Sequence, residues 1–176
     1  MMDDPARIPP IDELAVAMEF NPGDLAANRQ EQLSPNQIEH LRRLQRRAVL
    51  IGAAGFLILT LLATIFLYIG QTGGGGILTL IGIFLTFCDA ILVSMMARHW
   101  YRLSADIRDG AVVIRSGLLT RTLRRAGNSS QYLVGIGDVR FPVKKEAFRT
   151  FRHEALYTLY YAPHAHILLT AEPANV

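Results

Sequence analysis

Two long apolar runs dominate the pattern of hydrophobic and polar positions along the chain. The first covers residues 48–69 and has no charged residue, and the second covers residues 77–97 and has one, Asp89. Each run of about 21–22 residues allows a helix to cross the roughly 30 Å hydrocarbon core of a bilayer. The core helix of a soluble protein normally has a polar stripe at helical period, and neither run has one. We therefore expect two membrane spans.

The residues around these runs predict a helical hairpin. Ser34 suits a helix cap, Pro35 suits the first helical position, and Gln37 completes a capping box with Ser34. No helix breaker follows before the first run, so we expect one continuous helix from Pro35 through that run. The link at residues 70–76 is short, uncharged and rich in glycine. It predicts two antiparallel helices in a region covering residues 35–97.

Basic residues flank only the outer ends of the two runs. They are Arg42, Arg43, Arg46 and Arg47 before the first run, and Arg98 and Arg102 after the second. The positive-inside rule then predicts that both termini are cytoplasmic. We expect a multi-pass protein of the bacterial inner (cell) membrane, with the lipid bilayer as its first partner.

The segment before the hairpin, residues 1–34, is acidic and rich in proline. The pattern predicts short helices at residues 11–20 and 25–33, separated by a turn at residues 21–24. Helices of this length are marginal alone. The segment is therefore either largely disordered or docked on another part of the protein.

Beyond residue 102 the hydrophobic pattern changes to a period of two. Asp109-Gly110 predicts a hairpin turn between residues 105–107 and 111–114, and Gly117 is expected to break the second of these strands. Further hairpins are expected at 132–143 and 156–170, with a short helix at 144–151. The fold class is a membrane α-helical hairpin plus a small antiparallel β domain at 102–172. With about six strands, that domain is expected to be barrel-like or sandwich-like.

Composition argues against two properties, nucleic-acid binding and a disulfide within the chain. The net charge is +3 and the isoelectric point is about 9.3, but the basic residues lie in the membrane flanks and the tail. The chain therefore lacks the overall pattern of a nucleic-acid binder. The single cysteine, Cys88, lies in the second run, so no disulfide within the chain is possible.

Asp89 is the first candidate functional residue. An ionised carboxylate at the centre of a span costs about 2.5–3.5 kcal/mol on insertion scales. We expect Asp89 to form an intramembrane polar contact, either with Thr60, Thr64 or Ser94 or with a neighbouring subunit. A proton or ion relay is the alternative. Small residues in the first run, Ala48, Gly52 and Gly55, predict close packing of the hairpin or of a dimer.

Other polar residues suggest weaker sites. Five arginines of the tail are candidates for contact with anionic lipid headgroups: Arg115, Arg121, Arg124, Arg125 and Arg140. An ordinary solvated basic surface explains them equally well. His164 and His166 resemble a metal-binding pair, but a zinc site needs three or four ligands, so they are expected to be exposed in a turn. His153 with Glu154 has no accompanying nucleophile, so no catalytic, cofactor or metal site is predicted.

Short stretches resemble known membrane proteins. The juxtamembrane start at 33–37 and the motifs at 132–143 and 160–169 look like those of small bacterial two-span proteins of unassigned role. More loosely, residues 106–119 (DIRDGAVVIRSGLL) resemble the first strands of bacterial proteins with membrane-linked pleckstrin-homology-like domains. The resemblance implies a β domain beside a membrane anchor. It implies no activity and no site residues.

Together these patterns predict a non-enzymatic integral membrane protein. Its anchor would hold a cytoplasmic β domain that binds a protein, a second copy of the chain or the membrane surface. The first alternative is an accessory or regulatory subunit of a larger membrane complex. A membrane-bound enzyme is a more distant alternative.

Overall fold

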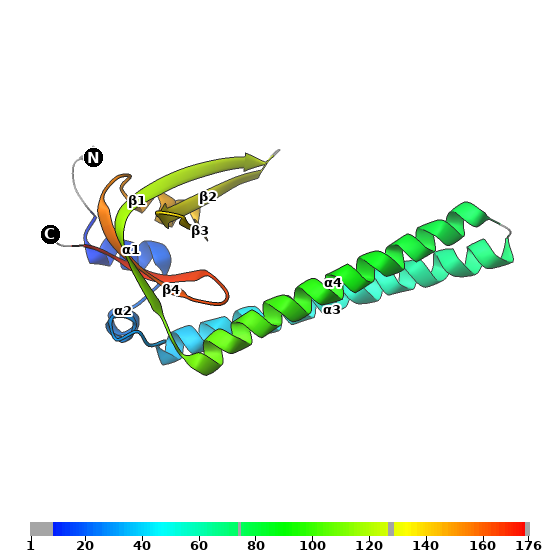
Figure 1. Ribbon diagram of the computed structural model, residues 1–176, viewed down its shortest axis with the longest axis horizontal. Coiled ribbons are helices and arrows are strands. Elements are labelled where there is room, and N and C mark those ends of the chain that lie inside the picture. Colours follow the sequence, from blue (N-terminus) through cyan, green and yellow to red (C-terminus); the bar gives the residue numbers. More distant parts are fainter. Residues whose placement is uncertain (1–8, 74, 127–128, 175–176) are drawn as a thin grey trace. The chain divides into compact units, whose positions relative to one another are not determined.

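The structure, a computed structural model, describes residues 9–73, 75–126 and 129–174 (Figure 1). They divide into two compact units. One is the helical hairpin, residues 39–107, and the other combines the described residues up to Ile38 with those from Arg108 onward. The two ends of the chain, on either side of the hairpin, thus form one unit. The start of the acidic segment, with Asp3 and Asp4, and residues 127–128 lie outside the described residues.

Two long helices, α3 (Pro35–Thr72) and α4 (Gly76–Asp109), contain the apolar runs. The predicted capping box is confirmed, since the Ser34 N–H donates to Gln37 Oε1 and the Gln37 N–H donates to Ser34 Oγ, both at 3.1 Å. As predicted, α3 continues without a break through the first apolar run.

The end of α4 differs from the sequence prediction. The helix continues to Asp109, so the strand expected at 105–107 and the hairpin turn expected at Asp109-Gly110 are wrong. Gly110 has a φ of +62°, the left-handed conformation that commonly terminates a helix. An Asp-Gly pair suits either a hairpin or a helix end. Here the preceding residues decide, because Leu103 and Ala105 are buried as part of the helix.

The second unit contains one antiparallel sheet of five strands in the order β3-β2-β1-β4-β5. The strands are β1 (Val113–Ala126), β2 (Ser129–Ile136), β3 (Val139–Val143), β4 (Leu156–Ala162) and β5 (Ile167–Pro173), with α5 (Lys145–Thr150) between β3 and β4. The hairpins β2–β3 and β4–β5 and the short helix are confirmed.

A continuous β1 reduces the expected six strands to five. Residues 113–118 pair with β4 and residues 119–126 pair with β2, so a single strand joins the two hairpins. Gly117 lies beside this change of partner. A Cβ atom there would be 2.7 Å from Ile136 Cγ2, so glycine permits a close approach between β1 and β2 where a strand break was expected.

The sheet is open, and the expected barrel or sandwich is wrong. The edge strands β3 and β5 contact each other but form no ladder. The curvature of the sheet brings the rings of Phe141 on β3 and Tyr161 on β4 to 4.9 Å between centroids. Only five residues long and with Pro142 lacking an N–H donor, β3 is poorly suited to close a barrel.

The acidic N-terminal segment packs on this sheet. The two expected helices are present as α1 (Ile11–Met18), which contacts α5 and β5, and α2 (Pro22–Arg29), which contacts β5. The second helix ends at Arg29, so the helix expected to reach residue 33 is wrong at that end. The start of α2 lies before residue 25 because Asn21 and Asp24 form a capping box, with bonds of 3.0 and 2.9 Å. The residues expected to form a turn therefore begin the helix.

Candidate functional site

The charged residue of the second apolar run is turned into the hairpin. Asp89 on α4 is 7 % exposed, and its Oδ2 accepts a hydrogen bond of 2.5 Å from Thr60 Oγ1 on α3. Of the other two hydroxyls considered from the sequence, Thr64 donates to the Thr60 carbonyl at 2.8 Å and Ser94 is exposed. Asp89 Oδ1 is buried, and the described part of the chain supplies no hydrogen-bond partner for it.

This geometry gives the hairpin a polar contact surrounded by apolar residues. A buried acceptor without a donor costs free energy, so the Thr60–Asp89 hydrogen bond is favoured over any helix pairing that would separate the two side chains. The contact can therefore fix the register of α3 against α4. The unfilled Oδ1 position can also accept one further donor.

Glycines bring the two helices close together. A Cβ atom on Gly52 would lie 2.1 Å from Met96 Sδ, and one on Gly82 would lie 3.0 Å from the backbone N of Leu67. Gly55 leaves an ordinary 3.6 Å to Leu92, and Ala48, the third predicted packing residue, lines a pocket instead. A Cβ atom on Gly70 would lie 2.6 Å from the backbone N of Thr79, so Gly70 also permits close approach. Gly70 and Gly82 were not predicted as packing residues, since the predicted ones all lie at one end of the first run.

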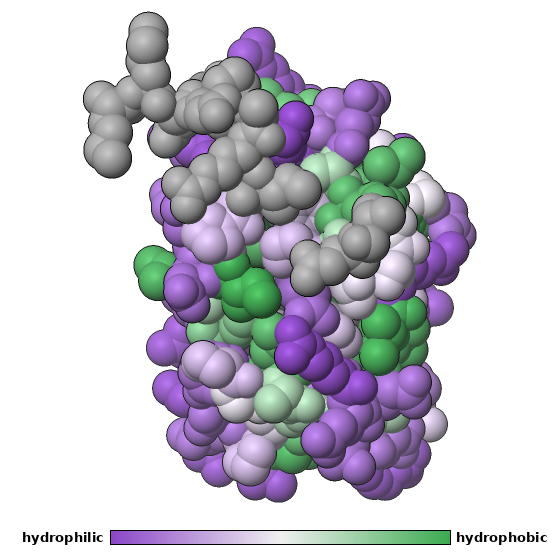
Figure 2. Space-filling view, turned by 90° about the vertical axis from the view of Figure 1, so that its left-hand side faces the viewer, coloured by the Kyte–Doolittle hydropathy of each residue, from purple (hydrophilic) through white to green (hydrophobic). Residues whose placement is uncertain are grey.

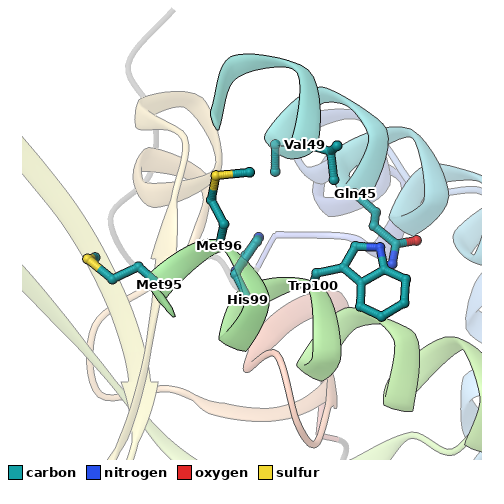
Figure 3. Close-up of a pocket in the computed structure, with 7 residues that line it drawn as sticks. Gln45, Val49, Met95, Met96, His99 and Trp100 are labelled. Carbon is teal, nitrogen blue, oxygen red and sulfur yellow. The ribbon is translucent and has the colours of Figure 1, made fainter. Parts of the chain in front are cut away.

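A pocket lies between the helices on the N-terminal side of Gly52, at the end of the hairpin that is rich in arginine. It has a volume of about 290 Å³, and Gln45, Ala48 and Val49 line it from α3. Met95, Met96, His99 and Trp100 line it from α4, and in Figure 3 Met96 extends toward α3 while Met95 extends away from it. A second pocket of about 340 Å³ adjoins the first, sharing Val49, Met96 and Trp100.

The five arginines of the sheet do not form a single surface. Arg115 pairs with Asp138 at 2.9 Å. Arg121 lies 4.3 Å from the centre of the Phe148 ring and donates to the Phe151 carbonyl at 3.0 Å, so it belongs to the packing beneath α5. Three others are exposed, namely Arg124, Arg125 and Arg140. By strand alternation, Arg124 and Arg140 share one face of the sheet and Arg125 lies on the other.

A polar cluster joins α2 to β4 and β5. Asn28 Nδ2 donates to Thr170 Oγ1 at 2.7 Å, and both residues are fully buried. Beside them Arg29 and the Tyr160 hydroxyl, the latter at 2.5 Å, bind the Glu172 carboxylate. The sequence predicted a helix at 25–33 that contains Asn28 and Arg29. The pattern of the tail did not predict that Thr170 and Glu172 would be their hydrogen-bond partners.

The cluster shifts the titration of its members. Burial and then the bond to Glu172 raise the pKa of Tyr160 to about 12. Burial acts to raise the pKa of Glu172, but the hydrogen bonds from Arg29 and Tyr160 outweigh it, so the pKa lies below its ordinary value. The carboxylate therefore stays charged at neutral pH and holds α2 against the sheet.

The histidines considered from the sequence are not grouped. His164 Nε2 lies 3.2 Å from Asp109 Oδ2, whereas the His166 ring stacks on Tyr161 at 6.2 Å. His153 Nδ1 accepts the Arg121 backbone N–H at 3.2 Å and Nε2 lies 3.7 Å from Glu154. Among the described residues there is no group of three or more His, Cys, Asp or Glu side chains placed to hold a metal ion.

Comparison of the chain with protein-family models, curated proteins and solved structures gives no match. Three features of the structure bear on function. They are the hairpin with its inward-facing Asp89, the pockets between its helices, and the sheet unit with its docked N-terminal helices.

Proposed function

We propose that this chain is a non-enzymatic integral membrane protein in which α3 and α4 cross the bilayer and anchor the sheet unit. The arrangement of side chains on the hairpin carries the proposal. In the most apolar stretch of each helix only 11 % of the residues are buried, whereas a core helix of a soluble protein would be mostly buried. Large apolar side chains such as Leu57, Ile83 and Phe87 point outward while Asp89 points inward. This inside-out pattern suits a lipid solvent.

Unlike the apolar exterior of the hairpin, the face shown in Figure 2 is mainly hydrophilic, and its hydrophobic residues form separate patches. Leu118 and Leu123 of β1 are exposed to 58 % and 46 %. By strand alternation, Leu118 shares a face of the sheet with Arg124 and Arg140, and Leu123 shares the other face with Arg125. An exposed apolar side chain on the same face as a guanidinium offers a partner both an apolar and a charged contact. We assign the sheet unit a binding role, toward a protein or the membrane surface.

The first test is extraction of the full-length protein from native membranes. The protein should stay in the membrane fraction after an alkaline carbonate wash and float with the vesicles on a density gradient. Release by the wash would contradict the two spans. After mild detergent extraction, co-purification of a stoichiometric protein partner would identify the chain as an accessory subunit, whereas liposome binding by the sheet unit without the hairpin would identify surface binding.

A second prediction concerns orientation. The outer ends of the apolar stretches have six arginines, while the described residues of the link are uncharged, so both termini should be cytoplasmic. In a Cys88→Ser background, a cysteine at Pro10 or Ala165 should react with an impermeant maleimide only after permeabilisation. The control, Gln71→Cys at the link, should react in intact cells. Labelling of either terminal position in intact cells would overturn this orientation.

A further inference from the structure

The two adjoining pockets form one apolar groove along the hairpin, which we call the base groove. It extends from Gln45 to Phe56 on α3 and from Trp100 to Val93 on α4. At the rise of an α-helix, Gln45 to Phe56 covers about 16 Å, which is about half of the roughly 30 Å hydrocarbon core. The groove thus has the depth of one leaflet.

The sequence leaves this groove open. At Gly52 the helices touch through Met96, so they are held together just above the first pocket. The lining on either side of that contact includes the small residues Ala48, Ala53 and Ala97, which cannot fill the space between the helices. The remaining side chains, apart from Gln45 and His99, are apolar. A flexible hydrocarbon chain fits such a surface better than a second helix, which is about 10 Å across.

Cationic residues follow the same helical stripes at the arginine-rich end of the groove. Arg42 and Arg46 lie seven and three positions before Val49, and so fall on the same side of α3. On α4, Arg98 and Arg102 continue the stripe of Met95 and His99 in the same way. All four are exposed, and none forms an ion pair within the described part of the chain. The apolar groove therefore has a positively charged mouth.

We propose that the base groove binds one acyl chain of an anionic phospholipid, whose phosphate lies among these arginines. The proposal rests on the membrane insertion proposed above. It adds a site for a particular lipid class, in which the groove supplies the fit to the chain and the arginines supply the preference for charge. Because the groove lies between α3 and α4, a bound lipid would contact both helices. It would stabilise their pairing between Gln45 and Gly52, where the helices leave a pocket between them.

The only tryptophan of the chain, Trp100, lines both pockets, so its fluorescence reports on the groove directly. The full-length protein is reconstituted in phosphatidylcholine vesicles containing increasing fractions of a brominated lipid, which quenches nearby indole rings. Brominated phosphatidylglycerol should half-quench Trp100 at a mole fraction at least about fivefold lower than brominated phosphatidylcholine, since one arginine near an anionic surface contributes about that factor.

Paired variants separate the groove from the general lipid surface. Ala53→Phe or Ala97→Phe fills the groove and should remove the preference for phosphatidylglycerol, whereas Ala54→Phe, an exposed position outside the lining, should keep it. Arg46→Gln with Arg102→Gln should abolish the preference but leave quenching by brominated phosphatidylcholine. Arg43→Gln with Arg47→Gln, an equal charge change away from the groove stripe, should preserve it.

Each outcome decides between explanations. Equal quenching by the two lipids, unchanged in the filled variants, would show ordinary surrounding lipid and overturn the proposal. Trp100 shielded from both lipids, together with a crosslinked dimer, would show a second copy of the chain in the groove and also overturn it. If the protein does not float with the vesicles at all, the membrane insertion itself fails, and this result is recognisable before any quenching is measured.

Discussion

Asp89 combines two properties that rarely occur together, a buried carboxyl group and an oxygen without a donor. Its bond to Thr60 ties the two helices together, while Oδ1 gains nothing from the described residues. A packing role needs only the first property. A relay would need further polar groups along the hairpin, and the described hydroxyls nearby, such as Thr64 and Thr86, instead donate to backbone carbonyls of their own helices.

We predict that Asp89→Asn preserves the stability of the hairpin in detergent and that Asp89→Leu lowers it by about 0.6–2 kcal/mol, the range for hydrogen bonds between membrane helices. The measurement is unfolding of the full-length protein followed by circular dichroism. Ser94→Ala is the control and should have no effect, since Ser94 is exposed. Loss of function in Asp89→Asn with unchanged stability would instead support a relay, because an amide cannot titrate.

A second residue-scale prediction concerns Glu172. Its pKa in the folded protein is lowered, so it stabilises α2 docking above its ordinary pKa, and this contribution disappears as the pH falls through the lower, folded value. Hydrogen exchange should show protection of α2 at neutral pH and loss of that protection in acid. In Glu172→Gln the protection should be weaker at neutral pH and less dependent on acid. Identical acid profiles for the two proteins would contradict this role.

At the scale of elements, close contact between α3 and α4 depends on glycine. We predict that Gly82→Ala destabilises the hairpin by about 1–3 kcal/mol, the usual cost of overpacking, because the new methyl group would meet the Leu67 backbone at 3.0 Å. Gly76→Ala is a matched control on the same helix, since nothing lies within 4 Å of its Cβ position. Equal thermal stability of the two variants would show that the helices are not held at this distance.

Local patterns predicted the elements that depend on local chemistry. The capping box at Ser34 and Gln37, the uninterrupted α3, and the hairpin around Gly137 each follow from residues within a few positions of one another. The errors arise where partners distant in sequence decide. Gly117 remains within a strand because β2 and β4 pair with its two flanks, and Asp109-Gly110 ends a helix because α4 continues that far.

The candidate site shows the same division. The sequence identified Asp89 and offered Thr60 as a possible partner, since a charged residue in an apolar run is conspicuous and the nearby hydroxyls are few. It could not select Thr60 over Thr64, because that depends on the relative rotation of two helices. The base groove could not be predicted from the sequence either. It forms where small residues of both helices face each other, and that depends on how the helices pack.

At the scale of the molecule, the sheet unit is formed from two parts of the chain that the hairpin separates in sequence. The Leu33 N–H donates to the Gly110 carbonyl at 2.9 Å and the Val112 N–H to the Glu31 carbonyl at 2.9 Å, so the chain leaves and re-enters the unit at adjacent points. The acidic segment is thus part of the fold of the sheet unit, and it is hydrogen-bonded to the residues that precede the sheet.

We therefore predict that a chain in which a short Gly/Ser linker replaces residues 35–109 folds as a soluble unit, since the linker spans two hydrogen-bonded neighbours. Residues 110–176 alone should be several kcal/mol less stable, because they lose buried Leu14 and Leu25, each contributing about 1.5–3 kcal/mol, and the bond from Asn28 to Thr170. Urea unfolding of the two proteins measures the difference, and adding residues 9–34 as a separate peptide should restore part of it. Equal stability of the two proteins would show that the N-terminal helices only cover the sheet without stabilising it.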